Sequence, residues 1–415
     1  MALHTLTILS RSSAPILHKI SCLSKLYADC PLVFALSPNV EPPELSKLVK
    51  ALTTFSTQAI GCLSAPLPDR SYQNLIACSL AVFKPEDCVV FRSTIPGRPT
   101  PQVGRWHAFR NKDEAPTQNH APPEGAFNWA DIWDGSAGGV LLPPSLQQIG
   151  PGDVSEVVYF SDNSPEGLSN SLQLKGGQQL GLIATSTPFV TGRPVTLFHN
   201  RDIYDSGAVG IVIKRLQKGR ARTRTEFLGA IPLSSPMTVT HCEGNLVNSL
   251  DGSNPTQLLL NAIQKSGMEM DASGSFKNDE KFLLGTIRSG MLGQIYNITA
   301  GDPHRGSISL ESQNAPMAGT QVQFFHRPKS TIVKAPTRSS LSSINSIQFL
   351  TAPETTLEAN TDQAEETESV KIISNTFLAS SENGFIICRS DHDEAETAWT
   401  CTVPGGVATL EWPTL

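Results

Sequence analysis

Short apolar runs that end at turn residues recur along this chain, and they restrict its fold more than any other feature. The run at residues 32–36 ends at Ser-Pro-Asn, and the run at residues 59–63 ends at Ser-Ala-Pro. Apolar runs of about four to eight residues that are bounded by turns are typical of buried strands. The chain is therefore expected to contain many short strands.

Helical spacing of apolar residues is confined to a few segments. It occurs between Glu41 and Phe55, and again from about Pro255. A third helical face lies near the amino terminus, where Ser13 is a candidate N-cap and Pro15 falls in the first turn. This mixture predicts an α+β fold of two packed mixed or antiparallel sheet domains with flanking helices.

Composition shifts divide the chain. Residues 96–128 are rich in prolines and charges, and residues 331–370 are rich in Ser, Thr and acids, so both are expected to be disordered. We therefore expect the following segments: an N-terminal helix or presequence at 1–29, a first domain at 30–230 with its excursion at 96–128, a second domain at 231–330, the acidic insert at 331–370, and strands at 371–415 that complete the second domain.

The N-terminal segment has two interpretations. Residues 1–28 carry Arg11, Lys19 and Lys25 and no acidic residue before Asp29, which is the composition of a mitochondrial presequence. The same segment could supply an amphipathic helix to the folded domain. The expected compartment is therefore intracellular, either cytoplasmic or mitochondrial.

Charge and motif content narrow the possible partners. The net charge of −6 offers no basic footprint for nucleic acid, and no apolar stretch reaches the length of a membrane helix. None of the eight cysteines forms a C-x-x-C pair, so we expect no metal site. Several of them lie in apolar stretches, as buried cysteines of a reducing compartment do, so we expect no disulfide. Without a P-loop, a dinucleotide-binding or a metalloprotease motif, we expect no cofactor.

Several segments together resemble the FIST family. The stretch PFVTGRPVTLFHNRDIYDSGAVGIVIK resembles the end of the FIST N-terminal region, and IGCLSAP is similar to its early strand and turn. MTVTHCEGNLVNSLDG resembles the opening of the FIST C-terminal region, while IYNITAGDPHRGSISLES and APMAGTQVQFFHR are similar to its later strands. These pieces cover most of residues 30–330.

The resemblance implies intracellular signal transduction through a small ligand, with amino acids proposed for the family. Animal members carry an F-box that docks onto a ubiquitin ligase, but no F-box-like segment precedes residue 30 here, and no signalling output is recognisable. The chain therefore resembles a stand-alone FIST module.

Nine residues are candidates for ligand binding, in four places. His241 and Glu243 flank Cys242 at a strand end, where a hairpin with one residue inside and one outside explains the same pattern. Asp302, His304 and Arg305 could hold a carboxylate, although a polar turn would look alike. Gly207 and Gly210 could line a ligand or allow close strand packing. Cys62 and Ser64 follow a strand, where α/β domains often present ligand-contacting groups.

His199 and Asn200 are expected to form a turn next to Arg201 and Asp202, exposed to solvent rather than functional. Our preferred interpretation is a sensor or adaptor that binds a small molecule in a cleft between the two domains and signals to a protein partner, with no catalytic residue required. The alternatives are a hydrolase or transferase with Cys242 or Cys62 as nucleophile, and a ubiquitin-ligase-related scaffold bound through the acidic insert.

Overall fold

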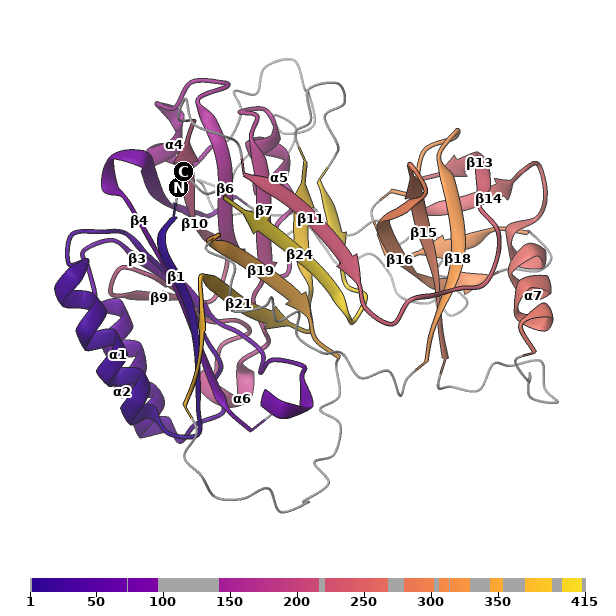
Figure 1. Cartoon of the computed structure of the whole chain (residues 1–415). Helices are drawn as coiled ribbons and strands as arrows, with labels where there is room; N and C mark the ends of the chain where they lie inside the picture. Colours follow the sequence, from indigo (N-terminus) through magenta and orange to yellow (C-terminus); the bar gives the residue numbers. More distant parts are fainter. Residues whose placement is uncertain are drawn as a thin grey trace, which may run out of the picture.

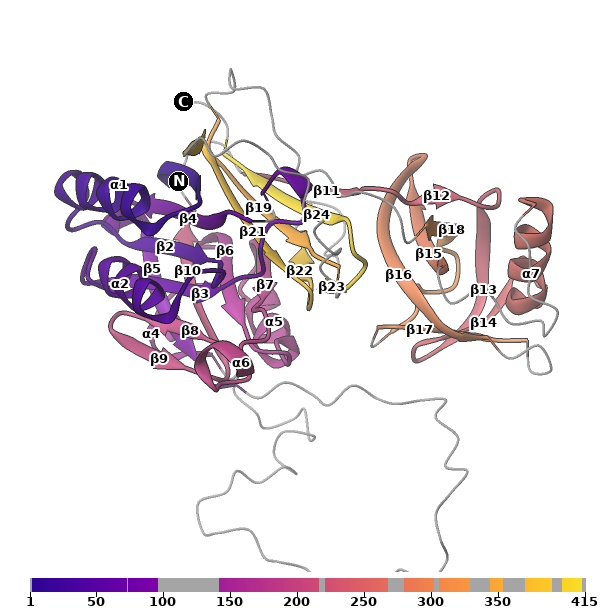
Figure 2. The ribbon, with the colours of Figure 1, turned by 90° about the horizontal axis from the view of Figure 1, so that it is seen from below.

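The computed structural model describes residues 2–72, 74–95, 142–215, 221–267, 280–301, 306–312, 314–328, 344–353, 370–389 and 398–412. Three sheets form a main body, and a barrel of strands is set to one side of it in both views (Figure 1, Figure 2). Helices flank the sheets of the body. The expected α+β class with packed sheets and flanking helices is confirmed. The expected excursion at 96–128 lies outside the described residues.

One four-stranded arrangement occurs three times within the described residues. In the first unit, β1 and β4 are antiparallel, β4 and β2 are antiparallel, and β2 and β3 are parallel, so the strand order is β1-β4-β2-β3. Its elements are β1 (Ala2–Ser10), α1 (Ser13–Leu26), β2 (Leu32–Leu36), α2 (Pro42–Thr53), β3 (Ala59–Leu63), the short helix η1 (Arg70–Tyr72) and β4 (Ile76–Phe83).

The second unit repeats this order as β5-β10-β6-β7. As in the first unit, the second and third strands in sequence, here β6 and β7, are parallel. Its elements are β5 (Cys88–Ser93), α4 (Pro144–Gln147), β6 (Val154–Ser161), α5 (Glu166–Gln173), β7 (Gln178–Ile183) and β10 (Ala208–Lys214), and the short helix η2 (Pro85–Asp87) precedes it.

The third unit has the order β11-β24-β19-β21 with β19 and β21 parallel. Its strands are β11 (Arg222–Phe227), β19 (Ser346–Thr351), β21 (Thr376–Ser381) and β24 (Gly406–Glu411). The barrel is inserted between β11 and β19, the first and second strands of the third unit. In the first unit, helix α1 occupies the corresponding position in the chain. This arrangement explains why the third unit is spread over nearly half of the chain.

Units 1 and 2 also agree in local detail. Phe34 in β2 pairs with Gly61 in β3, and Tyr159 in β6 pairs with Gly181 in β7. A Cβ atom at Gly61 would lie 2.6 Å from the Phe34 ring, and one at Gly181 would lie 2.4 Å from the Tyr159 ring. Glycine is therefore required at both positions, because an aromatic ring from the neighbouring strand lies over it.

Hairpins join each unit to the next. The hairpin of β8 (Leu197–His199) and β9 (Asp202–Tyr204) follows β7 and the short helix α6 (Pro188–Thr191), yet it pairs with β3 of the first unit. The hairpin of β22 (Phe385–Cys388) and β23 (Trp399–Cys401) follows β21 and pairs with β7 of the second unit. A bridge between Ala65 and Ser380 joins the first unit to β21. The three units therefore close a cycle.

The free edge of β21 is covered by hydroxyl groups. The Thr7 hydroxyl donates to the Thr376 carbonyl at 2.8 Å and accepts the Leu378 amide at 2.9 Å. The Ser79 hydroxyl donates to the Leu378 carbonyl at 2.5 Å. These side chains are buried, so they satisfy backbone groups that would otherwise be desolvated without partners.

The inserted barrel closes because β18 pairs with both β13 and β15. Its elements are β12 (Ile231–Pro232), β13 (Met237–Glu243), β14 (Leu246–Leu250), α7 (Pro255–Lys265), β15 (Glu280–Arg288), β16 (Met291–Gly301), β17 (Ile308–Leu310) and β18 (Gln321–Pro328). The Trp399 ring of the body lies 6.0 Å from the Tyr296 ring of the barrel, and aromatic packing therefore forms part of the contact between them.

The structure corrects three expectations about the chain. Residues 371–415 do not complete the barrel, because β20 (Lys371–Ser374) pairs with β1, and the later strands pair within the body. Part of the insert expected to be disordered, residues 346–351, is the buried strand β19. Residues 2–10, expected within a helix or presequence, form strand β1 of the first sheet, and the predicted helix follows with Ser12 rather than Ser13 at its N-cap position.

Candidate functional site

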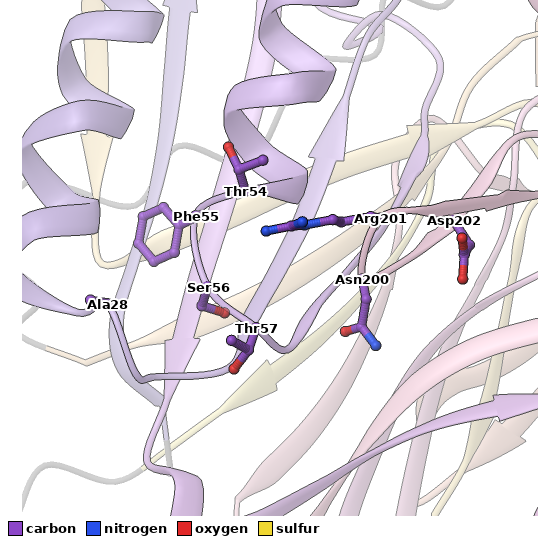
Figure 3. A pocket seen from close by; sticks show the side chains of 8 residues that line it. All are labelled: Ala28, Thr54, Phe55, Ser56, Thr57, Asn200, Arg201 and Asp202. Carbon is purple, nitrogen blue, oxygen red and sulfur yellow. The ribbon is translucent and has the colours of Figure 1, made fainter.

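A pocket of about 430 Å³ lies where the first two units meet. One wall is the connection between α2 and β3, and the other is the turn of the β8–β9 hairpin (Figure 3). Its lining residues are Ala28, Thr54, Phe55, Ser56, Thr57, Asn200, Arg201 and Asp202. The volume falls within the range of sites for small molecules, which is roughly 300–1,000 Å³.

The β8–β9 turn places Asn200 and Arg201 at the pocket. His199 pairs with Asp202, so Asn200 and Arg201 alone form the turn. Asn200 has a φ of 58°, a left-handed conformation that Asn tolerates better than most residues. Its amide donates to the Ala59 carbonyl at 2.6 Å, at the start of β3. The turn is therefore fixed to the first unit.

Arg201 is the cation of this pocket. Its side chain is exposed and extends towards Phe55, while the Asp202 side chain points away from the Arg201 guanidinium (Figure 3). Within the described part of the chain, Arg201 makes no hydrogen bond and no ion pair. A guanidinium in this setting can offer two parallel N–H donors to a carboxylate or phosphate.

The opposite wall begins where α2 ends. The Thr54 amide donates to the Lys50 carbonyl at 3.1 Å, which closes the last turn of the helix, and the chain then turns away through Phe55. Phe55 is buried in the core beneath the helices, so it anchors the connection. Ser56 and Thr57 follow at the pocket, where their hydroxyls can both donate and accept hydrogen bonds.

His199 lies just before the turn and is half-buried. Burial is the main cause that lowers its pKa below 6.5, and the nearby Arg92 guanidinium lowers the pKa further, while Asp202 acts in the opposite direction. The Arg92 guanidinium lies 4.5 Å from the centre of the Tyr204 ring in β9. Arg92 therefore packs against the hairpin strand that follows the pocket turn, and His199 belongs to the strand that precedes the turn.

Cys62 and Ser64 are both buried in the body, with Cys62 in β3 and Ser64 directly after it. Burial raises the pKa of the Cys62 thiol far above its usual value. A thiol that stays protonated is a poor nucleophile. Neither residue lines the pocket, although β3 forms part of its support.

Gly207 directly precedes β10 and Gly210 lies within it, and neither residue lines the pocket. The Gly207 amide donates to the Asp162 carboxylate at 2.5 Å, and a Cβ atom there would lie 2.4 Å from a terminal nitrogen of Arg92. A Cβ atom at Gly210 would meet the Phe91 ring at 2.5 Å. Close packing therefore explains why glycine occurs at both positions.

His241 and Glu243 are exposed on β13 of the barrel, and Cys242 between them packs partly against the core. The His241 ring nitrogen Nδ1 lies 3.1 Å from the Asn248 side-chain nitrogen. The structure places these residues in a different part of the molecule from Cys62 and Ser64. Asp302, His304 and Arg305 lie outside the described residues.

Sequence reasoning missed the pocket itself. The polar residues on both walls look like ordinary turns, and about 140 residues separate Ser56 and Thr57 from Asn200 and Arg201. The cleft expected between the two domains does not correspond to this pocket, which lies within residues 28–202. The only sequence signal was Asn200 and Arg201 between two apolar runs, a hairpin pattern that indicates a turn without indicating what it faces.

Two features are absent from the described ranges. No group of three or more His, Cys, Asp or Glu side chains is placed to hold a metal ion there. No helix in the same ranges combines the length and the apolar character needed to cross a bilayer.

No protein-family model matches this chain, and no curated protein matches it at a significant level. The fold and the pocket together define a three-unit α+β protein with an inserted barrel and an arginine-lined pocket at the seam between two units.

Proposed function

We propose that this chain is an intracellular ligand sensor or adaptor of the FIST type. Its ligand is a small polar metabolite such as an amino acid, and its output is a protein partner. The observation that carries the proposal is the pocket of about 430 Å³ that contains an arginine without a partner among the described residues.

The polar groups of the pocket suit an amino acid. Arg201 can take a carboxylate through its two terminal nitrogens. The hydroxyls of Ser56 and Thr57 offer acceptors for an ammonium group. Both charged groups of an amino acid would then meet an opposite charge or a hydrogen-bonding partner.

The position of the pocket supports a sensing role. Thr54 to Thr57 belong to the first unit, whereas Asn200 to Asp202 belong to the hairpin that the second unit contributes. A ligand that contacts both walls would bind more tightly when the α2–β3 connection lies close to the hairpin turn than when it moves away. Such a difference in affinity is what a ligand needs in order to shift a conformational equilibrium.

The buried Cys62 does not favour a cysteine-dependent hydrolase or transferase. A ubiquitin-ligase-related scaffold would bind through the acidic insert, whose residues 354–369 lie outside the described ranges. The pocket does not support that alternative.

Calorimetric titration with the twenty amino acids tests the proposal. We expect one or a few of them to bind, and Arg201→Ala to weaken that binding at least tenfold, because a charge-assisted bidentate contact contributes about 1.5–3 kcal/mol. Arg201→Lys should recover only part of the affinity, since an ammonium lacks the planar fork.

Arg193→Ala is the matched control. The Arg193 side chain is 42% exposed, and its guanidinium lies 3.9 Å from the Asp205 carboxylate that follows the hairpin, but it does not line the pocket. Its loss should leave affinity unchanged. A set of titrations without any binding, or equal losses in Arg193→Ala and Arg201→Ala, would reject the proposal.

A further inference from the structure

Asn200 carries a polar atom that the surrounding protein does not satisfy. Its side-chain oxygen Oδ1 is buried and accepts no hydrogen bond within the described residues. Most buried polar side-chain atoms in native proteins have a hydrogen-bond partner, so an exception needs a physical reason. Asn200 also lines the pocket at the seam of the first two units. A molecule bound in the pocket can therefore supply the missing partner.

The backbone of the turn explains only part of this residue. Asn200 has a φ of 58°, and Asn and Gly tolerate this left-handed conformation better than most residues. Its backbone amide is already used, because it donates to the Ala59 carbonyl at 2.6 Å. Glycine would meet both requirements without burying a polar side chain. The unpaired oxygen therefore needs an explanation of its own.

The side-chain amide of Asn200 has a definite orientation. Its oxygen lies on the side of Ser56 and Thr57, and its nitrogen lies on the opposite side (Figure 3). Arg201, the other residue of this two-residue turn, extends its guanidinium into the same pocket (Figure 3). Two successive residues of the turn therefore present a cation and a hydrogen-bond acceptor.

The seam between the third unit and the first differs from the seam that holds the pocket. Tyr72 follows β3 there, and Lys371 precedes β21. The Lys371 ammonium lies 4.5 Å from the centre of the Tyr72 ring and donates to the Tyr72 hydroxyl. The protein itself thus supplies the partner of that cation. In the described part of the chain, neither the Arg201 guanidinium nor the Asn200 oxygen has such a partner.

We propose that Asn200 makes the pocket selective for carboxylic acids that carry an N–H or O–H donor on the carbon next to the carboxylate. Arg201 binds the carboxylate, and the Asn200 oxygen accepts the hydrogen bond of the donor. One carbon separates these two groups in the ligand, as Asn200 and Arg201 are neighbours in the chain. The inference rests on the proposed ligand binding and adds which second group of the ligand is recognised.

The chemistry of the acceptor defines the selected class. A site built to pair with an N–H or O–H group rejects an analogue without that group, because the buried acceptor is then left unpaired. The pocket therefore favours 2-amino and 2-hydroxy acids. It disfavours unsubstituted acids, which have no donor, and 2-oxo acids, which present a second acceptor to the Asn200 oxygen.

Calorimetric titration with matched acids tests this selectivity. The probes are the amino acids that bind the wild-type chain, each with the 2-hydroxy, 2-oxo and unsubstituted acids of the same carbon skeleton, such as lactate, pyruvate and propanoate for alanine. The 2-hydroxy acid should bind within tenfold of the amino acid. The 2-oxo and unsubstituted acids should bind at least tenfold more weakly than the amino acid.

Asn200→Gly keeps the left-handed turn and removes the acceptor. It should weaken binding of the amino acid at least tenfold and leave binding of the unsubstituted acid unchanged, so that the preference disappears. A distorted turn would instead weaken both by the same factor. Asn200→Asp retains an acceptor oxygen and should retain the preference, although its charge weakens binding of every carboxylate.

Asn375→Gly is the matched control. Asn375 also has a φ of 58°, but it does not line the pocket, so its replacement should leave all affinities unchanged. Circular dichroism of the three variants checks that they fold.

Two results would overturn the inference and leave the proposed ligand binding in place. In the first, an unsubstituted or 2-oxo acid binds as tightly as the amino acid, while Arg201→Ala still weakens binding. In the second, Asn200→Gly retains the wild-type preference. A wild-type chain that binds no amino acid would reject the proposed function and this inference together.

Discussion

At the scale of single residues, the fold depends on contacts that allow no other side chain. Gly61 and Gly181 lie opposite Phe34 and Tyr159, and a methyl group at either glycine would overlap the facing ring. The sequence shows these glycines inside apolar runs, but it does not show which ring they face. Their role therefore became clear only from the strand register.

Gly181→Ala should destabilise the protein by about 1–3 kcal/mol, because its new Cβ atom forces the buried Tyr159 ring to move. Urea unfolding measures the change. Tyr159→Leu is destabilising by itself, but the two substitutions together should cost less than the sum of their separate effects, since the smaller side chain makes room. Simple additivity would show that the contact between ring and glycine does not matter.

His199 makes stability depend on pH. Its pKa is lowered in the folded protein, so below about pH 6.5 the unfolded chain binds a proton that the folded chain does not. The His199 contribution is fully present above that pH and is lost as pH falls towards the folded-state pKa. His4, whose pKa is lowered by burial and by Lys19, acts in the same direction.

Urea unfolding at pH 7.5, 6.5 and 5.5 checks this dependence. The free energy of unfolding of the wild type should decrease as the pH is lowered from 7.5 to 5.5, and the decrease should be smaller in His199→Gln. Identical pH profiles for the two proteins would mean that His199 is protonated as easily in the folded state as in the unfolded one.

At the scale of elements, local pattern predicted those elements whose residues are contiguous. The strand Leu32–Leu36 and the helix within residues 41–55 were expected from apolar runs and helical spacing, and both are present. Pairing between distant strands was not predictable, because period and turn residues do not specify a partner. The hydroxyls of Thr7 and Ser79 illustrate this limit, since they bind residues of strand β21 that lie 369 and 299 positions away in the sequence.

Thr7→Val should destabilise the protein by about 1–3 kcal/mol, because it leaves the Leu378 amide and the Thr376 carbonyl buried without their partner. Thermal or urea unfolding measures the loss. Thr7→Ser keeps the hydroxyl and should cost clearly less. An equal loss in both variants would assign the effect to altered packing rather than to the hydrogen bonds.

At the scale of the whole molecule, the three units and the inserted barrel were not apparent from the sequence. The third unit is interrupted between Phe227 and Ser346 by the barrel, so its strands read as parts of a separate second domain. The walls of the pocket also come from segments far apart in the chain. Only the folded chain brings residues 54–57 and 200–202 together.

Removal of the barrel tests this division. Strands β12 and β18 pair at Ile231 and His326, so the chain enters and leaves the barrel at neighbouring points. Replacing residues 231–328 with a short glycine-serine linker should leave a body that unfolds cooperatively and binds the ligand with unchanged affinity. Some stability should be lost, because Trp399 loses its contact with Tyr296. A body that fails to fold would show that the barrel is part of a single cooperative unit.

The pocket at the seam of the first two units is the centre of this account, and hydrogen–deuterium exchange with and without the amino acid that binds best tests it most directly. Protection should appear in peptides that cover residues 54–57 and 199–202, and it should disappear in Arg201→Ala. Protection confined to the barrel or to the contact between barrel and body would contradict the account.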